Sequence, residues 1–160
     1  MSEAKTLYDK DFVAWSEQQA EALRAAARTG SNQKLDWENL AEEIDSLARS
    51  ERRELRSQLI RVIQHLLKLE YSTAKNPRRG WGETVGDARR EIELLLETSP
   101  SLATELDAFV AAETPRGIKK AIADLEKHGE TKPTILLRLR ATTYTPDQIL
   151  GDWFPEEPKP

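Results

Sequence analysis

The chain has 160 residues, of which 38% are hydrophobic and 32% are charged, and its formal net charge is −4. This length is typical of one domain that buries a hydrophobic core without needing disulfides or a structural metal ion. There is no cysteine, which excludes disulfides, thiolate metal sites and cysteine nucleophiles. Residues 1–7 lack the apolar core of a signal peptide, so we expect a cytoplasmic protein. The uninterrupted apolar runs are too short to cross a membrane, so we expect no membrane span.

The first expected helix begins at residues 8–11 and ends near Arg28. Asp9 can accept a hydrogen bond from a free N–H of the first turn, and Asp11 complements the positive end of the helix dipole. Gly30 lies just beyond the last turn, where glycine is favoured at a helix end.

The strongest helical pattern follows Asp36, a good N-cap, and runs from Trp37 to about Tyr71 without proline or glycine. A helix of roughly 35 residues reaches about 53 Å, at about 1.5 Å per residue. A compact domain of this size has a diameter of about 40 Å. We therefore expect either a bend near residues 46–50 or packing of the excess length on a second copy.

The loop 72–80 separates this long helix from a third one, expected from about Trp81 to Thr98. Ser99 and Thr114 are each followed by proline, a pattern that favours the first turn of a new helix. They predict a fourth and a fifth helix, the latter ending at residues 128–129.

The remaining segments are shorter and less regular. Residues 134–143 alternate in a way that suits a short extended stretch, but no partner strand is evident, so no sheet is expected and the conformation of 130–144 stays open. Thr145 and Gln148 form a capping box that predicts a short last helix.

Together these elements predict an all-α fold: one helical-bundle-like domain over residues 1–160, ordered from about 7 to 155. It would contain five or six helices, with the long helix at the centre. Three tryptophans lie at apolar helix positions and are expected in the core. Trp153 is expected to hold the C-terminal tail against the rest of the domain. The three core tryptophans are Trp15, Trp37 and Trp81.

Charge is unevenly distributed along the chain. The net charge is −5 over residues 1–48, +6 over residues 49–90 and −5 over residues 91–160. The basic block could bind a nucleic-acid backbone, or it could pair with acidic helices of this chain or of a second copy. A pI of 5.4 favours the second interpretation. The candidate nucleic-acid residues are Arg49, Arg52, Arg53, Arg56, Arg78 and Arg79.

Few residues are candidates for a catalytic or metal site, since the chain has only two histidines, His65 and His128. His65 lies at the edge of the apolar stripe of the long helix, where a plain structural hydrogen bond is the usual role. Glu43 and Glu51, on the same helix, are the carboxylates that could join it in a metal or proton-transfer site. No Glu-x-x-His pair, phosphate-binding glycine loop or His-Glu-x-x-His helix occurs, so we expect no cofactor and no metal site.

Several segments carry a family resemblance over about residues 7–155. The most specific are residues 35–44, with Asp36-Trp37-Glu38-Asn39-Leu40, and residues 65–68, His-Leu-Leu-Lys. Others are residues 8–12, Ser99-Pro100-Ser101-Leu102 and residues 144–150. In these motifs the chain resembles the bacterial domain of unknown function 29 family. The resemblance implies a small, all-helical, cytoplasmic bacterial protein; it implies no activity and no catalytic residues.

Three functional hypotheses follow. The first, which the sequence favours, is a non-enzymatic interaction protein that self-associates through the long helix, with a further protein partner possible. The second is a nucleic-acid-binding or nuclease-type module that uses the block from Arg49 to Arg79. The third is a metal-dependent enzyme built around His65.

Overall fold

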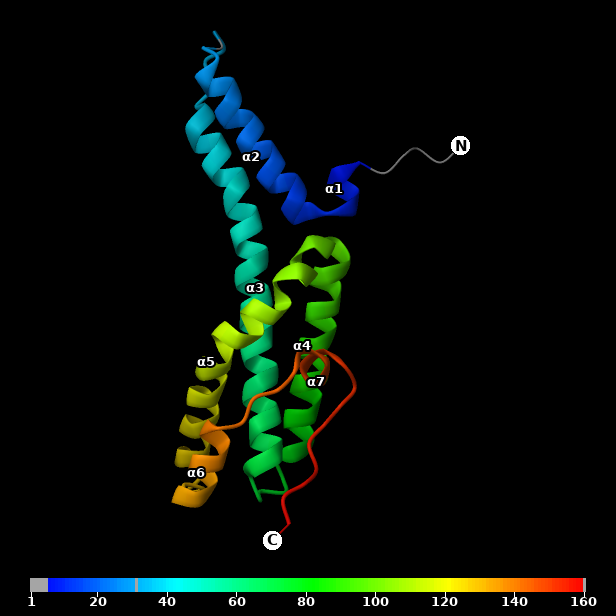
Figure 1. Ribbon diagram of the computed structural model, residues 1–160, viewed down its shortest axis with the longest axis vertical. Coiled ribbons are helices and arrows are strands. Elements are labelled where there is room, and N and C mark those ends of the chain that lie inside the picture. Colours follow the sequence, from blue (N-terminus) through cyan, green and yellow to red (C-terminus); the bar gives the residue numbers. More distant parts are fainter. Residues whose placement is uncertain (1–5, 31, 160) are drawn as a thin grey trace, which may run out of the picture. The chain divides into compact units, whose positions relative to one another are not determined.

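The computed structural model describes residues 6–30 and 32–159, and every regular element within these ranges is helical (Figure 1). The all-α expectation is confirmed. The elements are α1 (Leu7–Lys10), α2 (Phe12–Arg28), α3 (Trp37–Tyr71), α4 (Arg78–Thr98), the 3-10 helix η1 (Pro100–Glu105), α5 (Leu106–Lys127), α6 (Pro133–Arg140) and α7 (Pro146–Leu150).

The chain divides into two compact units. Residues Met1–Leu55 and Leu94–Glu105 form the first, and Arg56–Glu93 and Leu106–Pro160 form the second. Two helices, α3 and α4, contribute to both units. The single domain expected over 1–160 stays a prediction.

In the first unit, α2 and the first part of α3 lie side by side (Figure 1). Arg24 of α2 joins them through a bond of 3.0 Å to Asp45 of α3. The expected single helix over 8–28 is wrong, because Asp11 is extended (φ −157°) and separates α1 from α2. Asp11 is the N-cap of α2, while the Asp9 carboxylate accepts from the backbone N–H of Thr6 at 3.1 Å.

The long helix is as expected, since α3 runs without interruption from Trp37 to Tyr71 and shows no break at residues 46–50. Its buried side chains recur every three or four residues, as a helix with one apolar face requires. In the second unit they include Leu59, Val62, Ile63, Leu66 and Leu67.

The expected helix start at Thr114 is wrong, because α5 continues through Pro115 to Lys127. Proline removes one backbone donor from a helix, but buried residues of α5 both precede and follow Pro115. Val110 precedes the proline, and Gly117 and Ala121 follow it, all in the core. Burial of this continuous face outweighs the lost hydrogen bond. The expected fourth helix is also different, since residues after Ser99 form η1 before α5 begins.

The segment 134–143 is not extended. Pro133–Arg140 form α6, with Pro133 in its first turn. Ile135 and Leu136 are half-buried and Leu139 is buried, a spacing that fits a helix as well as a strand. The capping box at Thr145 is confirmed, since its hydroxyl accepts from the backbone N–H of Gln148 at 3.2 Å.

The tryptophans divide by burial. Trp81 is buried as expected, whereas Trp15 and Trp37 are only half-buried. Trp153 is exposed, but its carbonyl accepts a hydrogen bond from Arg89 of α4. The same guanidinium bonds the carbonyls of Gln148 and Ile149, each at 2.8 Å. Arg89 therefore fastens α7 and the following segment to α4 within the second unit.

Candidate ligand-binding cleft

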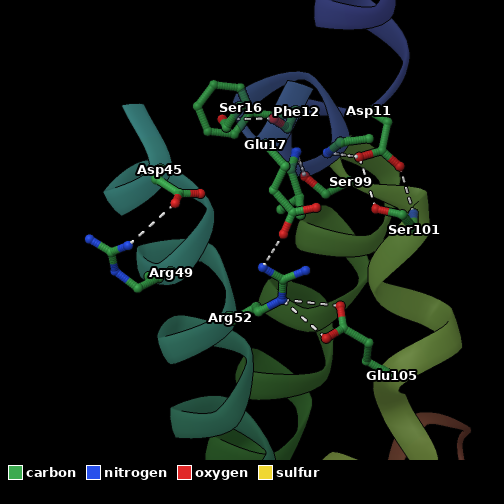
Figure 2. A network of polar contacts seen from close by, with 12 residues as sticks. Asp11, Phe12, Ser16, Glu17, Asp45, Arg49, Arg52, Ser99, Ser101 and Glu105 are labelled. Carbon is green, nitrogen blue, oxygen red and sulfur yellow. Dashed lines mark hydrogen bonds and ion pairs between the residues drawn. The ribbon is translucent and has the colours of Figure 1, made fainter. Parts of the chain in front are cut away.

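A polar network occupies the first unit where α2, α3 and η1 meet (Figure 2). The Asp11 carboxylate accepts from the backbone N–H of Ala14 at 2.8 Å and from the N–H and hydroxyl of Ser101 at 2.7 and 3.0 Å. Burial raises the pKa of Asp11, but these hydrogen bonds outweigh it and hold the pKa below the ordinary value. The Ser99 hydroxyl accepts from the N–H of Val13 at 3.2 Å. These bonds tie η1 to the start of α2.

Arg52 is the second part of this network (Figure 2). Its guanidinium donates to Glu17 at 2.6 Å and to both oxygens of Glu105 at 3.1 Å. Burial lowers the pKa of Arg52, but these two carboxylates outweigh burial and raise it. A predicted phosphate-binding residue is thus engaged in joining α3 to α2 and η1.

Most of the other candidate nucleic-acid residues also have acidic partners. Arg49 pairs with Glu42 and Asp45, Arg56 with Glu113, Arg78 with Glu157, and Arg79 with Glu83. Arg53 is exposed, and no ion pair is described for it. These pairs reduce the positive charge available to a phosphate backbone. Nucleic-acid binding stays a prediction.

The weak catalytic candidates have separate surroundings. His65 donates from Nδ1 to the Arg61 carbonyl at 2.8 Å, and burial is the main cause that lowers its pKa. Glu43 is exposed, while burial and the charge of Glu54 raise the pKa of Glu51. Within residues 6–30 and 32–159, no group of three or more histidine, aspartate or glutamate side chains could hold a metal ion.

A cleft of about 690 Å³ lies in the second unit, among the end of α3, the loop 72–77, the start of α4 and the end of α5. Its apolar walls are Trp81, Leu125, Pro77 and Ala74. A volume of about 300–1,000 Å³ is typical of small-ligand sites. The polar lining residues are Lys68, Ser72, Lys75, Asn76, Asp124, His128 and Glu130.

Lys68 and Asp124 form the polar centre of this cleft. The buried ammonium of Lys68 donates to Asp124 Oδ2 at 3.0 Å and lies 4.6 Å from the centroid of the Trp81 ring. Gln64 donates to the same oxygen at 2.7 Å. Burial raises the pKa of Asp124, but the bonds from Lys68 and Gln64 outweigh it and lower the pKa. The charge of Lys68 is thus matched within the chain.

The end of α5 supplies two further polar side chains. His128 is exposed, and Glu130 is half-buried just after Gly129, whose φ of 71° ends the helix. Glu130 Oε2 is buried and has no hydrogen-bond partner among the described residues. A buried carboxylate oxygen without a donor is costly, so Oε2 is an acceptor that a donor from outside the chain would stabilise.

Sequence reasoning did not single out this cleft. In the sequence, Lys68 was visible as part of the His-Leu-Leu-Lys motif and of the basic block, and Asp124 and Glu130 as parts of an acidic segment. One signal could have found Lys68: it stands between Leu67 and Leu69 on the most apolar stretch of α3. A lysine there needs a buried acidic partner.

A model of the domain of unknown function DUF29 matches residues 7–154. The chain belongs to the DUF29 family. An α-helical protein of unknown function from Rhodospirillum rubrum ATCC 11170, known from a crystal structure, is similar to this DUF29 chain with a TM-score of 0.70. The two are 25% identical, over 94% of this chain and 92% of the other. Comparison with curated proteins gives no match. No helix in the described part of the chain is long and apolar enough to cross a membrane.

Proposed function

We propose that this DUF29 chain is a non-enzymatic interaction protein that recognises a small ligand, or one side chain of a partner, in the cleft of its second unit. The observation that carries the proposal is the cleft itself, with its volume of about 690 Å³ and Trp81 in its wall. An aromatic ring beside apolar neighbours offers a large contact area to a small organic group. The absence of cysteine from the chain agrees with a cytoplasmic location, which is part of the same proposal.

The test uses the indole N–H signal of Trp81 in NMR spectra of the full chain, assigned through Trp81→Phe. Three aromatic probes of similar shape are titrated: 2-phenylethylammonium, 2-phenylethanol and 3-phenylpropionate. We expect saturable shifts of the Trp81 signal with at least one probe. The absence of a shift with all three probes would refute the proposal.

A matched pair of variants locates the binding. Ala74 lines the cleft on the loop after α3, whereas Ala123 is exposed on α5 and does not line it. Ala74→Phe should fill the cleft and abolish the shifts, and Ala123→Phe should preserve them. Equal binding by both variants would place the probes elsewhere and contradict the proposal.

Self-association through α3 is the second part of the proposal, and exposed leucines support it. Leu40 and Leu47 are each 40% exposed and stand seven residues apart, hence on one side of the helix. Glu43 and Glu54 are exposed on the same side, so two copies of this face would repel each other while the carboxylates are ionised. Light scattering after size exclusion should therefore show association that strengthens with salt and is lost in Leu47→Glu. A strict monomer at micromolar concentration and high salt would overturn this part.

A further inference from the structure

We infer that the cleft of the second unit is selective for a ligand that carries an ammonium group on an apolar body. This inference rests on the proposed function and adds the charge of the ligand. It starts from Glu130, a residue that lines the cleft and whose buried oxygen Oε2 accepts no hydrogen bond within the described chain. A carboxylate oxygen only accepts hydrogen bonds, so a ligand that satisfies Oε2 has to supply a donor.

The charges that line the cleft favour a cation as that donor. The positive charge of Lys68 is held by Asp124, which already accepts from Lys68 and Gln64 through one oxygen, Oδ2. Lys75 is exposed at the loop and His128 is exposed at the end of α5, so both can turn to solvent. Among these groups, Glu130 Oε2 is left as the buried carboxylate oxygen that accepts no hydrogen bond within the described chain. A charged donor compensates a buried carboxylate better than a neutral one.

The cleft also contains an example of the recognition that we infer. The Lys68 ammonium is bound by a carboxylate on one side and by the Trp81 ring, 4.6 Å away, on the other. Trp81, Leu125 and Pro77 would cover the apolar body of the ligand. A free alkyl or aralkyl amine and a lysine side chain of a partner protein share this chemistry.

The experiment compares probes of similar shape whose polar groups are positively charged, neutral and negatively charged. In the wild-type chain, 2-phenylethylammonium should bind about tenfold or more tightly than 2-phenylethanol, because hydrogen bonds to charged groups are the stronger ones. The anionic 3-phenylpropionate should bind most weakly. Tighter or equal binding of the alcohol or the anion would overturn the inference while leaving the proposed function intact. The absence of binding by all three probes would overturn both.

Two variants assign the selectivity to one carboxylate. Glu130→Gln should weaken binding of the ammonium probe about tenfold and leave the alcohol unchanged. Glu126→Gln, at an exposed position of α5 outside the cleft lining, should change neither affinity. An unchanged preference for the ammonium probe in Glu130→Gln would contradict the role of Glu130. If that variant does not fold, the wild-type comparison still decides the inference.

A last comparison separates the two sources of the ammonium group. A short acetylated peptide with one lysine is measured beside the same peptide with norleucine. Binding of the lysine peptide more tightly than both the norleucine peptide and the free amine supports a protein partner. Tighter binding of the free amine supports a small-molecule ligand. A norleucine peptide that binds as tightly as the lysine peptide contradicts the inference.

Discussion

Gly117 of α5 packs closely against Ile63 of α3, and replacing it with alanine should destabilise the protein. A Cβ atom at this position would lie 2.5 Å from Ile63 Cγ2 and 2.9 Å from Ile63 Cβ, both on α3. Ile63 is itself buried, with 1% of its surface exposed, so it has little room to move. Overpacking of this kind costs about 1–3 kcal/mol.

Helix propensity acts in the opposite direction, so the variant needs a matched control. Glycine to alanine within a helix gains about 0.5–1 kcal/mol when nothing obstructs the new methyl group. Gly86 in α4 is such a position, because no heavy atom lies within 4 Å of its added Cβ. Gly86→Ala should therefore stabilise the protein, and the propensity gain cancels when the two variants are compared.

The measurement is the free energy of unfolding in urea, followed by circular dichroism at the helix band. Gly117→Ala should be less stable than Gly86→Ala by about 1–3 kcal/mol. Gly117→Ala also reports on folding of α5 against α3, because the contact exists only when these helices are packed. Equal stability of the two variants would refute the close approach of Gly117 to Ile63.

Three further predictions concern named contacts. Asp11→Ala removes the N-cap of α2 and the acceptor for Ser101, and should lower the free energy of unfolding in urea by about 2–4 kcal/mol. A decrease below about 0.5 kcal/mol would exclude a tertiary role for this cap. The raised pKa of Glu51 means that its carboxylate is disfavoured in the folded protein above that pKa, and the penalty disappears as the pH falls below its ordinary value. Glu51→Gln relieves the burial of the charge and, second, the repulsion by Glu54. It should therefore stabilise the protein at pH 7 by no less than a like-charge helix pair costs, about 0.2–0.5 kcal/mol, and have no effect at pH 3.5; the reverse pH order would contradict the assignment. Arg89→Ala removes three bonds to backbone carbonyls of α7 and the segment after it. The hydrogen-bonded amides of Gln148, Ile149 and Gly151 should therefore lose protection from hydrogen exchange, and unchanged protection would show that other contacts hold α7.

The helices that the sequence predicts well are those with one long apolar face. In α3 apolar side chains recur with the 3.6-residue helical period from Trp37 to Tyr71, and the buried side chains recur with the same period. The expectations failed where local signals competed with tertiary burial. Thr114-Pro115 has the form of a helix start, yet Val110 and Gly117 are both buried in one continuous helix.

The candidate site was harder to anticipate because its parts are distant in sequence. Lys68, Trp81 and Asp124 meet only when α3, α4 and α5 pack together. Periodicity shows which face of a helix is apolar, but it does not show which charged side chain on another helix will match a buried lysine. His65 was a candidate catalytic residue because the chain has only two histidines. In the structure its Nδ1 donates to the Arg61 carbonyl of the same helix.

The two compact units cannot be separated by a cut in a loop. Two of their three boundaries fall inside helices, in α3 between residues 55 and 56 and in α4 between residues 93 and 94, and the third lies between the end of η1 and the start of α5. Excising either unit would open two hydrogen-bond ladders in mid-helix and leave up to about four donors and four acceptors unpaired at each severed helix. Fragment studies of this protein should therefore retain both helices whole, since a truncation at either unit border would probe severed helices instead of an autonomous piece.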